Sequence, residues 1–440
     1  MNIIGFSIIP LTEQNGICGI KTDNDFIIFK YDRSNIESHL DKLISANTTI
    51  YISDSRLLYR ALLNIINPEK LLKLNVFDCK LFLHLYKNHT NIDIYSIGNK
   101  HFKIDCQFEI NRINRIWKIQ NRKNNWNYIP DNIKEIYLEK ESLLSLEIGK
   151  KFNKLKLSEE SIKYQQTIFE FLLYLSKIEQ NGIFNTKSGK LVIPRYEYDK
   201  SATGRLLNNE PFCYQTLNKQ KFFNLYSSRF GSDGFLVTAD WSNVEFRTAL
   251  ALSEQQNISL GDDPYYDFAQ KIYNKKEITD FDRKNAKQHI LEILYGYNTN
   301  NQHAKTLYSL YPNLKIFKEF IIQKTLKEQK ITTFLGKTRY FNSGDNIYTK
   351  AFNTLNQMTV ADFCKLAIIE LQKEFESKKY KSVVVPYIVY DQFCFDIQNE
   401  EKQQVIPSIN KILTEVAIPL EFRKSVEFKV KLKDKNQNIY

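Results

Sequence analysis

The sequence predicts an α+β fold that is preceded by a small α/β domain. Three observations support this prediction. Residues 1 to about 90 alternate short apolar, strand-like runs with helix-like segments. Farther along, apolar runs such as 235–237 and 383–389 are separated by segments whose apolar residues recur at helical spacing. With 440 residues, 42% of them hydrophobic, the chain is long enough for two or three domains with real cores.

Composition narrows the classes of partner. The net charge of +12 favours a polyanion, although many basic proteins bind no nucleic acid. No apolar run reaches the 18 residues of a membrane span and no basic segment precedes the apolar N-terminus, so we expect no membrane partner and a cytoplasmic location. The six Cys show no C-x-x-C spacing, which argues against zinc and against a disulfide framework.

Residues 1–92 are expected to form the α/β domain. Apolar runs at 3–9, 17–20 and 26–29 predict a meander of three strands, which a helix at 36–44, a strand at 49–52 and a helix at 56–65 follow. The first strand carries no acid. Asp23 and Asp25 lie in a polar turn, and Asp54 and Asp78 alone are too few ligands for a pair of metal ions.

Residues 93–160 are basic and interleave cations with aromatic side chains. Two interpretations stay open. The segment grips single-stranded nucleic acid by phosphate contacts and base stacking, or it is a connector whose tryptophans pack on a neighbouring domain. The residues concerned are Arg112, Arg115, Trp117, Lys118, Arg122, Lys123 and Trp126.

A predicted amphipathic helix at 165–182, ended by Gly182, opens the next region. It is followed by Thr203-Gly204-Arg205-Leu206, then by Pro211 and Gln215. Gly204 allows the backbone to approach a nucleic acid closely, and Arg205 can hold a phosphate or a base edge. Thr-Gly-Arg is also common in ordinary loops.

Residues 235–247 place a carboxylate between a strand and a helix. The run 235–237 predicts a buried strand, and Val244 and Leu250 lie at near-helical spacing beyond it. Asp240 therefore lies at a strand end, where a stiff scaffold can present its oxygens to a hard cation such as Mg²⁺. The alternative is an acidic helix N-cap.

One predicted helix places four residues at a spacing of four along one face and ends at Gly296. Its twelve-residue span of about 18 Å is enough to lay two cations along a triphosphate and an aromatic ring under a base. An Arg/Lys pair at this spacing is otherwise an ordinary solvated face. The residues are Arg283, Lys287, Leu291 and Tyr295.

Two segments near the C-terminus complete the pattern. Asn353 and Gln357 lie one helical turn apart, where their amides could donate to minor-groove acceptors or serve as buried caps. The run 383–395 predicts a hairpin whose tip is Tyr390-Asp391, and a helix at 405–416 and a strand at 426–432 follow.

These segments, in this order, resemble the motifs of family A DNA polymerases, the bacterial DNA polymerase I group. Asp240, Ser242, Glu245 and Arg247 match motif A; Arg283, Lys287, Tyr295 and Gly296 match motif B; Asp391 matches motif C. Residues 203–206, 334–340 and 351–365 resemble its Thr-Gly-Arg-Leu, Phe-Gly-Arg-x-Arg-Tyr and Ala-Phe-Asn segments. The departures from the family pattern are Trp241 for Tyr, Asn243 for Gln, Leu291 for Phe or Tyr, Tyr390 for His and Gln392 for Glu.

The resemblance implies a polymerase domain at 161–440, with a right-hand palm at 161–255 and 330–440 and fingers at 256–329. It also implies that 1–92 is a ribonuclease-H-like exonuclease-type domain, which the missing acids make vestigial, and that 93–160 connects the two. In the family, well over a hundred residues that form the thumb separate the opening helix from Thr-Gly-Arg. Here only residues 183–202 do, so we expect the thumb to be reduced or absent.

Residue roles follow from the resemblance. The expected cofactors are two Mg²⁺ ions, or Mn²⁺ in their place, held by Asp240 and Asp391, with Lys287 as a further catalytic residue. The expected nucleotide-binding residues are Arg283, Lys287, Tyr295, Glu245 and Leu291. The expected DNA-binding residues are Arg205, Gln215, Arg247, Asn353, Gln357 and Tyr390.

The implied activity is template-directed addition of dNTPs to a primer 3′-hydroxyl, without proofreading and with weak processivity. The implied partners are primer–template DNA and dNTPs, with an accessory protein or self-association in place of the thumb. An enzyme that makes RNA or needs no template on the same palm is an alternative, against which Glu245 argues. A non-catalytic nucleic-acid-binding factor is another, against which Asp240 and Asp391 argue.

Overall fold

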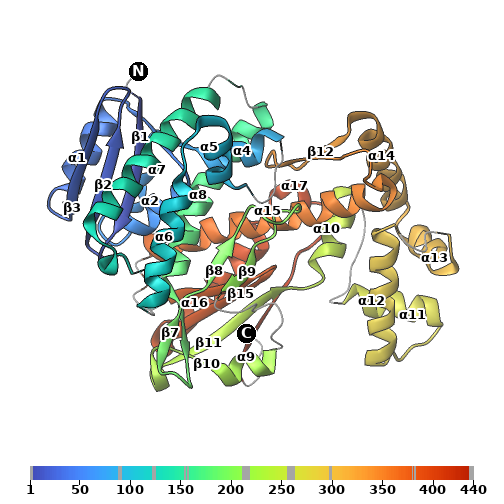
Figure 1. Cartoon of the computed structure of the whole chain (residues 1–440). Helices are drawn as coiled ribbons and strands as arrows, with labels where there is room; N and C mark the ends of the chain where they lie inside the picture. The colour runs from blue at the N-terminus through green and yellow to red at the C-terminus, as the bar shows by residue number, and fades with distance from the viewer. Residues whose placement is uncertain are drawn as a thin grey trace. The chain divides into compact units, whose positions relative to one another are not determined.

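A computed structural model of the chain describes residues 3–87, 92–120, 125–152, 155, 158–210, 219–254, 263–296, 300–378, 380 and 383–435 (Figure 1). The chain divides into two compact units, Met1–Lys177 and Ile178–Tyr440, which we call unit 1 and unit 2. Helix α8 (Glu159–Asn181) runs across the boundary between them. The mixture of helices and strands confirms the predicted fold class.

Unit 1 is built on a five-stranded sheet of order β3-β2-β1-β4-β5. The first three strands form the predicted antiparallel meander, and β1, β4 and β5 run parallel. The middle of β1 is buried throughout, which is why it is apolar at successive positions rather than at alternate ones. The strands are β1 (Ile3–Pro10), β2 (Asn15–Lys21), β3 (Phe26–Asp32), β4 (Thr49–Ile52) and β5 (Val76–Asp78).

Several helices of unit 1 begin at side-chain caps. Asp54, Asp93 and Asp105 accept hydrogen bonds from the first backbone N–H groups of α2, α5 and α6. Helix α7 packs on β1 and β2. The helices are α1 (Ile36–Ser45), α2 (Ser55–Leu62), α3 (Pro68–Leu72), α4 (Cys79–Lys87), α5 (Ile94–Phe102), α6 (Cys106–Ile119) and α7 (Asp131–Phe152), with a 3₁₀ turn at Trp126–Tyr128.

The predicted connector at 93–160 is largely helical and includes α5, α6 and α7 of unit 1. Trp117 and Trp126 meet edge to face, with ring centroids 5.2 Å apart, and pack against the core that includes Ile9 and Ile113. Of the two interpretations offered for this segment, packing of the tryptophans is therefore the one observed. Arg112, Arg115 and Lys118 are exposed on α6.

The acids of unit 1 have structural partners. Asp54 pairs with the Arg56 guanidinium (Nη2–Oδ2 2.9 Å), and Asp78 is fully buried and accepts from the backbone N–H groups of Ser55 and Leu81. The Asp25 backbone closes the predicted turn by hydrogen bonds with Thr22. The exonuclease ancestry of this unit stays a prediction.

Unit 2 is organised around a four-stranded antiparallel sheet of order β14-β15-β11-β16, which we call the palm sheet. Strand β11 lies between β15 and β16, and its apolar residues Val237 and Ala239 are fully buried. Helix α10 follows β11 after a turn at Asn243, which has a left-handed φ of 58°. The elements named here are β11 (Gly234–Trp241), α10 (Val244–Leu252), β14 (Val383–Val389), β15 (Gln392–Gln398) and β16 (Val430–Asp434).

Helices flank the palm sheet. The long helix α15, orange in Figure 1, packs against α10 and α14. The predicted helix at 405–416 is α16 followed by a π-helical turn, and the predicted last strand begins four residues later than expected, at Val430. These elements are α15 (Ile347–Ser377), α16 (Lys402–Lys411), a π-helical turn (Ile412–Val416) and α17 (Leu420–Arg423), with 3₁₀ turns at Gly231–Asp233 and Asn399–Glu401.

The predicted fingers interval forms four helices, drawn in yellow to orange in Figure 1. They are α11 (Pro264–Tyr273), α12 (Asp280–Leu294), α13 (Gln302–Leu310) and α14 (Pro312–Glu328). A capping box between Thr279 and Asp282 fixes the start of α12, and Gly296 follows its end with a left-handed φ of 85°, as the sequence predicted.

The remaining strands of unit 2 are short. The interval from Gly182 to Thr203 contains strands and no helix in its described residues. Hairpin β12–β13 is the predicted one at 334–340. The elements are β6 (Ile183–Asn185), β7 (Lys190–Val192), β8 (Arg195–Glu197), β9 (Leu207–Glu210), α9 (Lys219–Leu225), β10 (Tyr226–Ser227), β12 (Lys330–Thr332) and β13 (Thr338–Tyr340).

Candidate active site

A cavity of about 420 Å³ in unit 2 brings most of the predicted site residues together. They come from four separate parts of the chain: the loop after β8, the end of β11 with the start of α10, helix α12, and the β14–β15 hairpin. The lining residues that the sequence singled out are Arg205, Asp240, Glu245, Arg283, Lys287, Leu291, Tyr390 and Asp391. The other lining residues are Trp241, Ser242, Asn243, Val244, Tyr265 and Lys431.

The two predicted metal ligands lie on adjacent strands of the palm sheet. Asp240 is the penultimate residue of β11 and pairs in register with Gln392 of β15, the residue directly after Asp391. Asp391 lies at the tip of the β14–β15 hairpin, which turns at Tyr390 with a left-handed φ of 53°. Strand pairing therefore sets these two carboxylates beside each other from positions 151 residues apart.

The electrostatics of this pair suit a cation. The pKa of Asp391 is raised to about 6, first by burial and then by the nearby Asp240 and Glu245 carboxylates, while Arg205 opposes the increase. Carboxylates crowded in this way need a positive charge if both are to ionise, and carboxylate oxygens are the ligands that Mg²⁺ prefers. No group of three or more His, Cys, Asp or Glu side chains in the described residues is arranged to hold a metal ion, so the candidate ligand set is this pair.

Helix α12 presents its cations to the cavity beside an aromatic ring. The Arg283 and Lys287 side chains lie over the Tyr265 ring, 5.8 and 5.7 Å from its centroid. Arg283 also forms an ion pair with Asp263, which caps α11. Leu291, one turn beyond Lys287, lines the same cavity.

Glu245 is fixed from two sides at the first turn of α10. Arg205 Nη2 donates to one of its carboxylate oxygens and the Tyr295 hydroxyl donates to the other. Its backbone carbonyl accepts a hydrogen bond from the Asn356 amide (2.9 Å) on α15. The Gln357 side chain contacts the same Tyr295 hydroxyl. The predicted nucleotide-binding residues Glu245 and Tyr295 and the predicted DNA-binding residues Arg205 and Gln357 thus form one network.

The end of α12 approaches α15 closely. A Cβ on Gly296 would lie 2.9 Å from the Thr349 Cα, so only glycine fits this contact. Farther along α15, Asn353 is half-buried, and its Oδ1 is buried without a hydrogen-bond partner in the described part of the chain. Buried acceptors normally have a hydrogen-bond partner, so the contacts of the described residues leave this side chain unsatisfied.

Among the predicted DNA-binding residues that the structure describes, Asn353, Gln357 and Arg247 do not line the cavity. Arg247 is fully buried, and its guanidinium donates to the backbone carbonyls of Ser242 (3.1 Å) and Glu427 (2.6 Å). It therefore joins α10 to the chain before β16 and offers no surface to a ligand in this structure. Gln215 lies outside the described residues.

The sequence reasoning missed three residues that belong to this site. Asp263 was not considered as a site residue, yet it pairs with Arg283. Tyr265 and Lys431 line the cavity and were not considered. Tyr265 carried a usable signal, because it follows the Asp-Pro cap of a helix in the predicted fingers. Lys431 could be found only from the register of the palm sheet.

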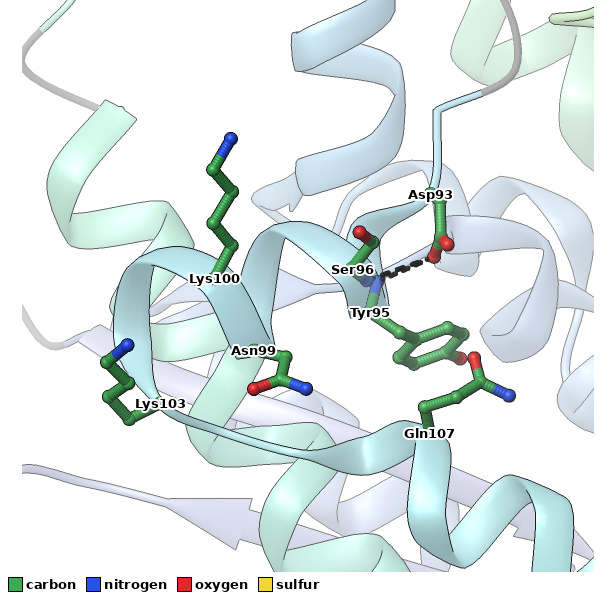
Figure 2. A pocket seen from close by; sticks show the side chains of 7 residues that line it. All are labelled: Asp93, Tyr95, Ser96, Asn99, Lys100, Lys103 and Gln107. Atoms are coloured by element: carbon green, nitrogen blue, oxygen red, sulfur yellow. Dashed lines mark hydrogen bonds between the residues drawn. The ribbon is translucent and has the colours of Figure 1, made fainter.

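A second cavity, of about 520 Å³, lies in unit 1 around α5 and the start of α6. Figure 2 shows Lys100 and Lys103 extending from α5 away from Tyr95. The lining acid, Asp93, is engaged in capping α5 through the N–H groups of Tyr95 and Ser96 (both 3.1 Å). This cavity therefore lacks the paired carboxylates of the site in unit 2.

In the described residues no helix is long and apolar enough to span a membrane.

Comparison with known proteins agrees with this geometry. A sequence profile of DNA polymerase family A matches residues 93–436, more than three quarters of the chain. The chain belongs to DNA polymerase family A. This membership confirms the resemblance of the motifs.

Curated relatives are distant and longer. DNA polymerase I of Lactococcus lactis subsp. lactis (strain IL1403) is 22% identical over 260 residues, which cover 52% of this chain and 30% of that protein. DNA polymerase I of Bacillus caldotenax is 24% identical over 295 residues, which cover 59% of this chain and 32% of that protein. DNA polymerase I of Borreliella burgdorferi is 24% identical over 332 residues, which cover 66% of this chain and 36% of that protein. This family A chain thus spans about a third of the length of these relatives.

A solved structure shares the fold. The POL domain of Pol1 from M. smegmatis, in complex with DNA primer-template and dNTP, superposes with a TM-score of 0.68 over 98% of this chain and 95% of that one, at 13% identity. The match extends the family A likeness from sequence motifs to the arrangement of helices and strands.

Proposed function

We propose that this family A chain is a template-directed DNA polymerase that adds dNTPs to a primer 3′-hydroxyl. The observation that carries the proposal is that one cavity is lined both by Asp240 and Asp391 and by Arg283 and Lys287 of α12. Carboxylates on one wall and cations on another are what a metal-assisted attack on a triphosphate requires.

Asp240 and Asp391 would hold two divalent cations, Mg²⁺ or Mn²⁺. When bound, such ions lower the pKa of the primer hydroxyl and stabilise the leaving pyrophosphate. The carboxylate pair fits this role because its residues crowd negative charge at the palm edge. Arg283 and Lys287 bind the triphosphate oxygens as negative charge develops, and Lys287 donates a proton to the pyrophosphate.

Glu245 excludes ribonucleotides in this proposal. The carboxylate is held in place by Arg205 and Tyr295, so it would stand rigidly where a ribose 2′-hydroxyl has to fit. This argues for DNA synthesis over RNA synthesis on the same palm. Leu291 contacts the sugar, and Tyr295 lies under the base.

DNA would be held mainly by unit 2. Arg205, Gln215, Asn353, Gln357 and Tyr390 are the proposed contacts, and the unpartnered Asn353 acceptor supports its part in this set. Arg205 also lies over the Tyr390 ring, 5.7 Å from its centroid. We further propose that unit 1 has no 3′–5′ exonuclease activity, since β1 carries no acid, and that the thumb is reduced. An accessory protein or self-association would then support processive synthesis.

Primer extension tests the proposal. The purified chain is given a labelled primer with dNTPs or NTPs, with and without a template, with Mg²⁺ or EDTA, and with a matched or mismatched primer end. Template-dependent extension with dNTPs and Mg²⁺ supports it. Extension with NTPs at equal rates, or without a template, favours the rival nucleotidyltransferase. DNA binding without any extension favours a non-catalytic factor.

A further inference from the structure

One lysine of the last palm strand is set beside the paired carboxylates. Strand β16 is an edge strand of the palm sheet, and Lys431 pairs in register with Asp240 of β11. Residues directly opposite on antiparallel strands point to the same face, with their Cβ atoms about 5 Å apart. The Lys431 ammonium, on its flexible four-carbon stem, therefore reaches the region in front of the Asp240 carboxylate.

The same lysine lines the candidate active site and is exposed there. Two of the other cations that line this cavity are engaged by acids: Arg205 with Glu245 and Arg283 with Asp263. No ion pair of Lys431 is found in the described part of the chain. Its charge is therefore available to a ligand that enters the cavity.

The order of the palm strands places Lys431 on a defined side of the carboxylates. Across the sheet, Gln392 of β15, Asp240 of β11 and Lys431 of β16 form one row, with neighbouring strands about 4.8 Å apart. Asp391 adjoins Gln392, so Lys431 flanks Asp240 on the side away from Asp391. An anion drawn to ions on the two carboxylates would meet this ammonium as a third positive group.

We propose that Lys431 is a phosphate-binding residue of this site, an inference that rests on the proposed polymerase function. The ligand is a phosphate group, which belongs either to the incoming triphosphate and its leaving pyrophosphate or to the primer backbone. Lys431 binds it as a point charge and donor and so complements Arg283 and Lys287 from the palm side.

The alternation of lysines on β16 has another explanation that the test must exclude. Charged side chains, lysine above all, protect the open edge of a sheet from pairing with other chains. Lys433 lies two residues along the same strand face, opposite Thr238, and does not line the cavity. It is the matched control, because edge protection would apply to both lysines and phosphate binding to Lys431 alone.

The experiment compares Lys431→Gln and Lys433→Gln in the full chain. Isothermal titration calorimetry measures the binding of pyrophosphate with Mg²⁺, and fluorescence anisotropy measures the binding of primer–template DNA across a salt series. We expect Lys431→Gln to weaken pyrophosphate binding about tenfold, which assigns the triphosphate source, or to reduce the salt slope of DNA binding by about one, which assigns the primer backbone. Lys431→Arg should restore the affected binding, and Lys433→Gln should leave both unchanged.

Equal effects of the two glutamine variants, or no effect of Lys431→Gln on either ligand, would overturn the proposal in favour of edge protection. Both measurements need no turnover. A wild-type chain that binds these ligands and yet fails to extend a primer would contradict the proposed polymerase function and not the role of Lys431. Thermal unfolding of each variant checks that the palm sheet remains folded.

Discussion

At the scale of single residues, Glu245 is a side chain of the candidate site that several hydrogen bonds hold in place. Its two carboxylate oxygens are held by donors from separate elements, Arg205 and Tyr295, and its carbonyl by Asn356. Because both carboxylate oxygens accept hydrogen bonds, the side chain could not move away from the 2′-hydroxyl of an incoming ribonucleotide without breaking them. The selectivity of the proposed polymerase therefore depends on the whole network.

Replacing Glu245 by Ala should admit ribonucleotides. We expect kcat/KM for an rNTP, relative to the matching dNTP, to rise by about 10–100-fold, because a steric and polar block is removed. Steady-state incorporation of single nucleotides measures this ratio. Tyr295→Phe, which removes one of the two donors to Glu245, should give a smaller rise. A wild-type chain that already uses both sugars equally would refute this role of Glu245.

Replacing Asp391 by Asn should abolish extension and leave DNA binding nearly unchanged. The amide keeps the shape of the side chain and removes the charge that holds a divalent cation, so we expect the extension rate to fall by about 10³-fold or more. Single-turnover extension and anisotropy of labelled DNA measure the two effects. Gln392→Glu is a useful companion, since it adds a carboxylate next to the pair. Full-rate extension by Asp391→Asn would contradict the assignment.

At the scale of elements, the loop that carries Arg205 is held against the β12–β13 hairpin. Gly204 has a left-handed φ of 73°, and a Cβ there would lie 2.4 Å from the Nζ of Lys337, which is only 2% exposed. Burial lowers the pKa of Lys337 to about 7. The tight contact between glycine and buried lysine sets the position from which Arg205 reaches Glu245.

Gly204→Ala should therefore destabilise unit 2 more than Gly189→Ala. Both glycines have a left-handed φ, which costs a non-glycine residue about 1 kcal/mol or more. Only Gly204 adds a clash, because nothing lies within 4 Å of a Cβ on Gly189. Urea unfolding followed by the fluorescence of Trp241, with Trp117 and Trp126 replaced by Phe, compares the two variants. Equal losses of unfolding free energy would show that Lys337 yields without cost.

In unit 1, Glu141 of α7 should make stability depend on pH. Burial raises its pKa to about 7 from 4.5, although the Ser53 hydroxyl donates to it. The folded chain then binds more protons than the unfolded chain between these values. Its contribution to the free energy of unfolding is therefore fully present below about pH 4.5 and is lost as the pH rises to about 7.

Glu141→Gln removes this dependence. We expect the unfolding free energy of the variant, relative to wild type, to increase by about 1–3 kcal/mol between pH 5 and pH 8. Urea unfolding in a Trp241→Phe background reports on unit 1 through Trp117 and Trp126. The nearby Asp78, whose pKa burial raises to about 6, titrates in both proteins and cancels in the difference. A difference that does not change with pH would show that Glu141 titrates normally.

Some contacts between elements of the site could be predicted from the sequence, and others could not. The meeting of Asp240 and Asp391 could be anticipated, because each lies at the end of an apolar run and the family resemblance implies the same role for both. The α12 face was equally readable from its four-residue spacing. The places of Asp263 and Lys431 in the site could not be predicted. Asp263 reaches Arg283 through the packing of helices, and Lys431 reaches Asp240 through strand register, and no local sequence pattern shows either. Arg247 matched a motif, yet its surroundings bury it.

At the scale of the whole molecule, the fold indicates how the proposed binding to DNA should depend on salt. The interval from Gly182 to Thr203 forms short strands, and the tryptophans of the basic segment are packed into unit 1. In the proposed polymerase, contacts between cations and phosphates would contribute much of the binding to DNA, and the exposed Arg112, Arg115 and Lys118 of unit 1 could add to those of unit 2. Binding of this kind releases counterions and weakens steeply with salt.

We therefore expect the isolated chain to dissociate after few additions. Primer extension under a heparin trap should yield products that are only a few nucleotides longer than the primer, and DNA affinity should fall by about 10³-fold or more between 50 and 200 mM salt. Long products from a chain that sedimentation shows to be monomeric would contradict the proposal of a reduced thumb. If a higher protein concentration lengthens the products, self-association supplies the DNA contacts that a thumb would otherwise make.

The place of β16 in the palm sheet has a consequence for how the chain is made. Strand β11 obtains its second neighbour only when β16 emerges from the ribosome, roughly 190 residues after Asp240. At ordinary translation speeds this takes about 10–40 s. During that time the nascent chain exposes an unpaired strand edge beside Asp240. The β11 edge of the candidate site is thus completed only after the residues of β16 have been made.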